Sequence, residues 1–149
     1  MEFEDFDQKL KIEKRYFIYL RKSSEEEDRQ ILSLEAQEEE LRYFAKKHNL
    51  NIVGLFSEAQ SAYKIGRPRF AEMLKGIKKS EANAVLCWQP NRISRNPKDA
   101  GDFLYLMSTN QILELCTPYK TFTPESNDIF FLTIELGMAK KIVIPNPKM

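Results

Sequence analysis

Histidine is almost absent from this chain: His48 is the only one in 149 residues. Zinc sites built on imidazole and a Ser-His-Asp triad are therefore disfavoured. Cys87 and Cys116 are the only cysteines, and both lie in apolar runs without ligand-like spacing, so they predict buried free thiols rather than a disulfide or a metal site. The five glycines form neither G-x-x-x-x-G-K-S/T nor G-x-G-x-x-G, which disfavours a glycine-rich nucleotide loop. We expect no metal and no cofactor.

Long apolar runs are also missing. The longest stretch without a charged residue covers 103–113, well short of the roughly 18 apolar residues that a membrane span needs. Residues 1–5 are acidic and lack the basic start of a secretory signal. With 42% hydrophobic residues, the composition predicts one ordinary domain with a core of useful size, located in the cytoplasm and without a membrane partner.

Charge is nearly balanced overall but unevenly distributed. Lys and Arg number 23 against 22 Asp and Glu, for a formal net charge of +1. Residues 1–40 carry 13 acids and 7 bases, a net charge of −6, whereas residues 41–149 carry 9 acids and 16 bases, a net charge of +7. The basic later part is consistent with an anionic partner, although the same polarity is common in proteins that bind none.

Strand-like and helix-like segments alternate from Tyr16 onward. Residues 1–14 are highly charged with scattered apolar side chains, which predicts an arm outside the core. The expected strands are 16–20, 51–56, 84–88, 112–116 and a short edge strand at 119–122. The expected helices are 28–47, one that opens at Pro68, one capped by Asn96, and 127–142. This alternation predicts an α/β fold with a mostly parallel sheet of four to five strands and helices on both faces.

The last expected helix differs from the others because residues 129–139 are apolar on nearly every side and carry one charge. One face of a sheet cannot cover such a helix. The pattern therefore predicts an oligomer interface, with a fully buried core helix as the alternative. The interface side chains would be Phe130, Phe131, Ile134 and Met138.

Arginines and hydroxyl side chains follow three of the expected strands. The three loops supply, in chain order, Arg21, Ser23 and Ser24, then Glu58, Ser61 and Arg67, then Asn91, Arg92, Ser94 and Arg95. In a parallel sheet these loops meet at one edge, where α/β proteins bind their ligands. Guanidinium groups around a hydroxyl suit a phosphate or phosphodiester, because each can donate two hydrogen bonds to phosphoryl oxygens. Any one of these residues alone would fit a solvated surface, but three loops in agreement favour a site.

Four motifs, one of them in two parts, resemble those of the serine site-specific recombinases, the resolvase and invertase group with its integrase and transposase relatives. Residues 19–24, Tyr-Leu-Arg-Lys-Ser-Ser, resemble the family's Tyr-x-Arg-x-Ser-Thr segment, and 33–37 resemble the Ser-Leu-x-x-Gln that follows. Residues 58–61 and 66–70 resemble Asp/Glu-x-x-Ser and Arg-Pro-x-Phe. Residues 91–96, Asn-Arg-Ile-Ser-Arg-Asn, resemble Asp-Arg-Leu-Ser-Arg-Asn.

The resemblance implies a mechanism for this chain. It places the nucleophile at Ser23 beside the activating Arg21, and it implies that Gln37 faces the active site. The remaining site residues would be Arg67, Arg92 and Arg95, which hold the attacked phosphate, together with Ser61 and Asn91. The implied substrate is DNA, which is cleaved and exchanged through a 5′-phosphoserine link without metal or ATP.

The resemblance also implies a fold and an assembly. The fold would be a three-layer, flavodoxin-like domain at residues 15–143 that ends in a long oligomerisation helix. The chain would form a homodimer, and a tetramer during strand exchange. Resolvase-like proteins continue into a helix-turn-helix or zinc-containing DNA-binding region, whereas we expect only the arm 1–14 and a tail at 144–149 outside the catalytic domain.

Two departures from the family pattern leave alternatives open. Asn91 stands where the family has Asp, and Lys140 stands where many small relatives have Glu. The chain could therefore be a catalytically impaired or truncated remnant that acts by assembling with a full-length recombinase. A flavodoxin-like or receiver-like signalling domain is a further alternative, but it would need an acidic metal pocket where this chain has Arg21 and Lys22.

Overall fold

The computed structural model describes residues 12–22, 32–59 and 64–137, and this part of the chain forms one sheet. Its strands are β1 (Arg15–Arg21), β2 (Asn51–Glu58), β3 (Ala84–Leu86), β4 (Glu114–Cys116) and β5 (Thr121–Phe122). They lie in the order β2-β1-β3-β4-β5, and all neighbours are parallel except β5, which pairs antiparallel with β4 at the edge. The expected mostly parallel sheet with a short edge strand is confirmed.

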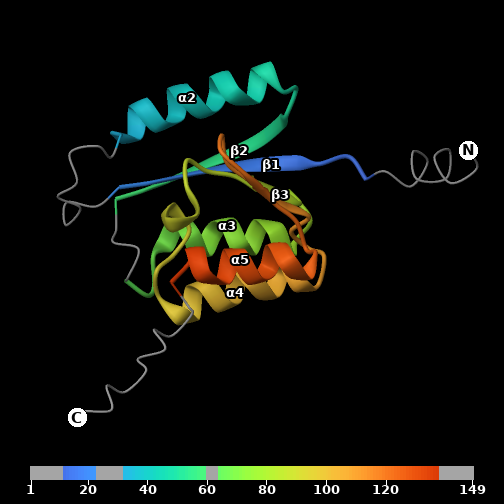
Figure 1. Ribbon diagram of the computed structural model, residues 1–149. Coiled ribbons are helices and arrows are strands. Elements are labelled where there is room, and N and C mark those ends of the chain that lie inside the picture. Colours follow the sequence, from blue (N-terminus) through green and yellow to red (C-terminus); the bar gives the residue numbers. More distant parts are fainter. Residues whose placement is uncertain (1–11, 23–31, 60–63, 138–149) are drawn as a thin grey trace, which may run out of the picture.

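Helices pack on both faces of the sheet. They are α2 (Leu34–Lys47), α3 (Pro68–Lys78), α4 (Pro97–Ser108) and α5 (Ser126–Glu135), with a short 3-10 helix η1 (Pro90–Arg92) between β3 and α4. Figure 1 shows α2 on one side of the sheet and α3, α5 and α4 together on the other. The described elements thus form three layers. None of these described helices is long and apolar enough to cross a membrane.

Strand β1 lies between β2 and β3 inside the sheet and separates two apolar cores. Its side chains alternate, so that Phe17 and Tyr19 pack toward the side of α3 and α4. Tyr16, Ile18 and Leu20 pack toward α2. All five side chains are buried. A strand that is covered on both faces needs apolar residues at every position, which accounts for this continuous run.

The ring of Phe17 fits between two glycines. A Cβ atom placed on Gly54 of β2 would lie 2.9 Å from the ring atom Cδ1 of Phe17. A Cβ atom placed on Gly76 of α3 would lie 3.0 Å from Cε2 of the same ring. The absence of side chains at these two positions therefore lets β2 and α3 pack directly against the ring.

The described helices begin in different ways. Ser33 caps α2 and Asn96 caps α4, and each side chain accepts a hydrogen bond from an N–H group in the first turn. Helix α3 begins at Pro68, and its cap residue Arg67 makes no side-chain capping bond. The first turn of α3 donates instead to the carboxylate of Glu58 at the end of β2. This carboxylate attaches α3 to the edge of the sheet where the candidate site lies.

Two expected helix boundaries are wrong. The helix expected at 28–47 begins at Leu34, because Ser33 is extended and caps it; residues 28–31 lie outside the described residues. The helix expected at 127–142 ends at Glu135, because Gly137 takes a left-handed φ of 73° and its N–H turns back to the carbonyl of Ile134. A long carboxyl-terminal helix is therefore not seen in the described part of the chain, which stops at residue 137.

Both cysteines are buried free thiols, as predicted. Cys87 lies in the core on the α3 and α4 side, and Cys116 lies in the core beneath α2. Burial raises the pKa of both thiols, so they remain protonated at neutral pH. The two cysteines therefore serve the packing of the sheet.

Enlarging Gly54 tests the close approach at Phe17. Gly54→Ala should lower the free energy of unfolding by about 1–3 kcal/mol, because the added methyl group overlaps the Phe17 ring. Urea unfolding followed by circular dichroism measures the change. The double variant Gly54→Ala/Phe17→Leu is the control: the smaller side chain makes room, so Gly54→Ala should cost less in that background. Equal costs in the two backgrounds would contradict the packing described.

Candidate active site

The carboxyl ends of β1 and β3 bring two arginines together at one edge of the sheet. Arg21 is the last residue of β1, and Arg92 ends η1, which follows β3. Because β1 and β3 are adjacent and parallel, the segments after them leave the same edge. Arg21 is 1% exposed and Arg92 is 4% exposed, so neither is a solvated surface residue.

Arg21 and Arg92 hold each other through reciprocal hydrogen bonds. Nε of Arg21 donates to the backbone carbonyl of Arg92 at 3.0 Å, and its Nη2 donates to the carbonyl of Asn91 at 2.9 Å. In return, Nη1 of Arg92 donates to the carbonyl of Arg21 at 2.9 Å. Nε of Arg92 donates to the side-chain oxygen of Asn91 at 3.0 Å. Asn91 therefore orients Arg92 although it lacks a carboxylate.

Arg67, immediately before α3, is buried against the same loop. Its Nη2 donates to the backbone carbonyl of Ile93, and its Nη1 donates to the hydroxyl of Tyr19 at 2.9 Å. Asp99 of α4 forms an ion pair with Nη2 at 3.5 Å. The guanidinium also stacks on Phe70, 4.3 Å from the ring centroid. Arg67 thus joins β1, α3, α4 and the loop after η1.

Glu58 is the buried acidic residue that β2 brings to this network. Its carboxylate accepts hydrogen bonds from the backbone N–H groups of Phe70 at 2.9 Å and Arg69 at 3.3 Å, in the first turn of α3. It also accepts a bond from the Tyr19 hydroxyl at 3.3 Å. Burial raises the pKa of Tyr19 well above its ordinary value, so the hydroxyl keeps its proton and bridges Arg67 and Glu58.

Gln37 of α2 ties together the two ends of the segment that contains Ser23. Its Nε2 donates to the carbonyl of Arg21 at 3.2 Å and to the carbonyl of Leu32 at 3.0 Å. The side chain is fully buried, and its Oε1 has no hydrogen-bond partner among the described residues. A buried acceptor next to Arg21 is therefore available to a hydrogen-bond donor.

Arg95 differs from the other three arginines. It is half-buried and makes no hydrogen bond or ion pair within the part of the chain that the structure describes. It lies beside Gly137 at the end of α5: a Cβ atom placed on this glycine would be 3.5 Å from Cδ and 3.7 Å from Nη1 of Arg95. The guanidinium of Arg95 therefore remains available to an external anion.

Three of the expected loop residues, Ser23, Ser24 and Ser61, lie outside the described residues. The approach of Ser23 to the guanidinium groups therefore stays a prediction. Hydrogen bonds to residues 91–93 join Arg21, Arg67 and Arg92 into one network. No hydrogen bond or ion pair in the described ranges joins the Arg95 side chain to that network.

Two members of the network, Tyr19 and Asp99, were not predicted as site residues, although Tyr19 is the first residue of the motif at 19–24. The apolar run assigns Tyr19 to the core, yet residues two apart in a strand share a face, so Tyr19 lies on the same side of β1 as Arg21. That periodicity and the motif at 19–24 were the available signals for Tyr19. The ion pair between Asp99 and Arg67 depends on the packing of α4 beside α3, which no local pattern indicates.

The chemical character of the site favours an anionic ligand. Its polar groups are mainly guanidinium nitrogens, held in place by carbonyl oxygens, an amide and two carboxylates. Planar guanidinium donors match the oxygens of a phosphate group. Within 12–22, 32–59 and 64–137, His, Cys, Asp and Glu side chains form no group of three or more that could hold a metal ion.

One known family and several solved structures are similar to this chain. The family model described as "Resolvase, N terminal domain" matches residues 16–140. The N-terminal catalytic domain of TP901-1 integrase is 24% identical with a TM-score of 0.64, over 84% of this chain and 93% of that one. A resolvase family site-specific recombinase from Streptococcus pneumoniae is 25% identical with a TM-score of 0.61, over 80% and 83%. The C-terminal catalytic domain of ISC1926 TnpA, an IS607-like serine recombinase, is 21% identical with a TM-score of 0.57, over 69% of each chain.

The contrast between Arg67 and Arg95 can be measured as stability. Arg67→Ala should lower the free energy of unfolding by about 3–5 kcal/mol, because it leaves the buried carboxylate of Asp99 without its counter-ion and removes the donor to the Tyr19 hydroxyl. Arg95→Ala should change it by no more than about 0.5 kcal/mol, since no described bond is lost. Urea denaturation of both variants provides the comparison. Similar losses at the two positions would show that the network does not depend on Arg67.

Proposed function

The chain belongs to the resolvase N-terminal domain family, the catalytic domain of the serine recombinases, and on that premise we propose that it cleaves and exchanges DNA strands with Ser23 as the nucleophile. The observation that carries the proposal is the anchored guanidinium network at the end of β1, two residues before this serine. Chain geometry keeps the Cα atom of Ser23 within about 7 Å of the Cα atom of Arg21.

The proposed reaction exchanges one phosphodiester for another. The Ser23 oxygen attacks the DNA phosphorus, the serine–phosphorus bond forms, and the bond to the 3′ oxygen breaks. The serine proton leaves, and the departing 3′ oxygen takes up a proton. Because the 5′-phosphoserine link conserves the energy of the broken bond, the 3′ hydroxyl of another strand can reverse the step and complete the exchange. The positive field of the arginines stabilises the negative charge of the transition state.

The four arginines have two different roles in this proposal. Arg21, Arg67 and Arg92 fix the loops and orient one another through their buried bonds. Arg95 is half-buried and free of described bonds, so we assign to it a direct contact with the attacked phosphate. The bond from Arg92 to Asn91 supports an active enzyme over an impaired remnant, because the amide oxygen supplies the orienting acceptor that a carboxylate would supply.

We further infer that α5 contacts a second copy of the chain. Phe130, Phe131 and Ile134 are 62%, 50% and 47% exposed, whereas Leu132 of the same helix is buried in the core. Met138, the fourth expected interface residue, lies outside the described residues. Burial of a few hundred Å² of this surface at about 25 cal/mol per Å² would provide several kcal/mol toward association, before the entropy of docking is subtracted.

Covalent capture of DNA tests the proposed nucleophile. The chain, fused to a DNA-binding domain of known specificity, should form a covalent link to a plasmid that carries the matching sites. Ser23→Ala should abolish this link, and the control Ser108→Ala on α4 should retain it. Arg95→Ala should slow its formation by about 100- to 1,000-fold while the fold is kept. Gel analysis after denaturation and peptide mapping measure the link, and its survival in Ser23→Ala would remove Ser23 as the nucleophile.

Association through α5 is tested by adding charge to its exposed face. The wild-type chain should show a concentration-dependent dimer in sedimentation equilibrium. The double variant Phe131→Glu/Ile134→Glu should be monomeric with an unchanged circular dichroism spectrum, because both side chains face water in the single chain. Tyr43→Glu on the opposite side of the sheet should leave the dimer intact. A wild-type chain that stays monomeric at high micromolar concentration would contradict this interface.

A further inference from the structure

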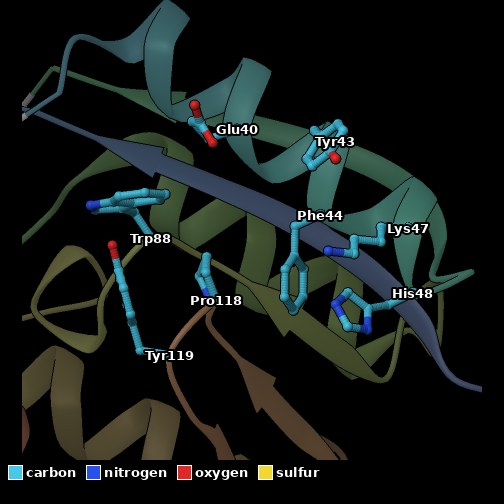
Figure 2. Close-up of a pocket in the computed structure, with 8 residues that line it drawn as sticks. All are labelled: Glu40, Tyr43, Phe44, Lys47, His48, Trp88, Pro118 and Tyr119. Carbon is cyan, nitrogen blue, oxygen red and sulfur yellow. The ribbon is translucent and has the colours of Figure 1, made fainter.

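A cavity of about 380 Å³ lies between α2 and the segments that follow β3 and β4. Figure 2 shows Trp88 and Tyr119 on one side of it and Phe44 and His48 on the other, with Pro118 between them and Tyr43 above on α2. The cavity is on the α2 side of the sheet, and the arginine network uses none of these residues. Its volume falls in the range of about 300–1,000 Å³ that is typical of ligand sites.

Aromatic side chains from three parts of the chain surround this cavity. Tyr43 and Phe44 belong to α2, Trp88 follows β3, and Tyr119 lies between β4 and β5. Trp88 and Tyr119 meet edge to face with their centroids 5.5 Å apart, which fixes the orientation of both rings. Tyr119 is 70% exposed and Tyr43 is 67% exposed, so large ring surfaces face the solvent around one hollow. This arrangement suits a planar ligand that stacks on the rings.

Charged groups of both signs surround the rings. Glu40 and Lys47 contribute from α2, and Lys120 lines an adjoining cavity. The edge of a nucleobase carries both hydrogen-bond donors and acceptors, which such a mixed set can match. The lysines can also approach the phosphates that flank a base.

A second cavity places the aromatic rings next to the arginine site. It has a volume of about 310 Å³ and is lined by Asn91, which orients Arg92, and by Tyr119, which also lines the aromatic cavity. Trp88 precedes Arg92 by only four residues. A nucleic-acid strand with a phosphate at the arginines can therefore place a nearby base among the rings.

We propose that the aromatic cavity binds an unpaired nucleobase of the DNA strand whose phosphate lies at the arginine site. The inference rests on the proposed function, because it takes DNA as the ligand. An unpaired base is required because the faces of a base inside a duplex are covered by its neighbours in the stack. The cavity would hold one strand at the cleavage point after the local base pairs open.

The single tryptophan of the chain supplies the test, because Trp88 is itself a wall of the cavity. A short oligothymidine should quench its fluorescence in a saturable way, through stacking of a base on the rings. An abasic oligonucleotide of the same length and charge should quench far less at the same salt concentration. Absence of quenching by oligothymidine, or equal quenching by the abasic strand, would overturn the proposal.

Variants of Tyr119 locate the effect in the cavity. Tyr119→Ala should weaken oligothymidine binding by about 5- to 150-fold, the usual effect of removing one stacking ring. Tyr119→Phe keeps the ring and should bind as the wild type does. Tyr105→Ala, an equally exposed tyrosine on α4, is the matched control and should also bind normally. Equal affinities for Tyr119→Ala and Tyr105→Ala would overturn the assignment.

Fluorescence quenching and the covalent link to DNA test the base site and the nucleophile separately. Both Ser23→Ala and the wild-type chain should show the same quenching, because stacking needs no covalent step. A covalent link to DNA without quenching would remove the base site and leave Ser23 in place. Quenching without a covalent link would support the base site and count against Ser23.

Discussion

The hydrogen bonds that Arg21 and Arg92 exchange across the ends of β1 and β3 are the constraint on which the rest of the site depends. Each guanidinium donates to the other residue's backbone carbonyl, so neither loop can move without breaking bonds of both. Arg67 attaches α3 to the same loop through the carbonyl of Ile93, and Gln37 attaches α2 through the carbonyl of Arg21. A buried polar network of this kind specifies one arrangement of the loops around it.

The residues that hold the loops in place differ from those that are open to a ligand. The buried arginines position the backbone, whereas Arg95 is only half-buried and Tyr43 and Tyr119 of the aromatic cavity are largely exposed. The arginine network is built against α3 and α4, whereas the aromatic cavity is built against α2. Both meet the carboxyl edge of the sheet near Asn91, so one strand of a nucleic acid could contact both.

Much of the fold follows from local signals in the sequence. The run at 16–20 predicted a strand covered on both faces, and the cap at Asn96 predicted the start of α4, because these signals act through neighbouring residues. The end of α5 was missed because a left-handed Gly137 closes a helix that its apolar neighbours would extend. The arginines were expected at one edge, but their bonds to backbone carbonyls were not, since every residue offers the same acceptor and no pattern marks the one that is used.

We propose that the fixed arginine network presents a DNA phosphate to Ser23. A crystal structure of the chain with a short single-stranded DNA bound tests this claim most directly. We expect a phosphate within hydrogen-bond distance, about 3 Å, of both the Ser23 hydroxyl and the Arg95 guanidinium, with the bonds between Arg21 and Arg92 intact. A phosphate bound away from Ser23, or loss of the bonds between Arg21 and Arg92 when the phosphate binds, would contradict this role of the network.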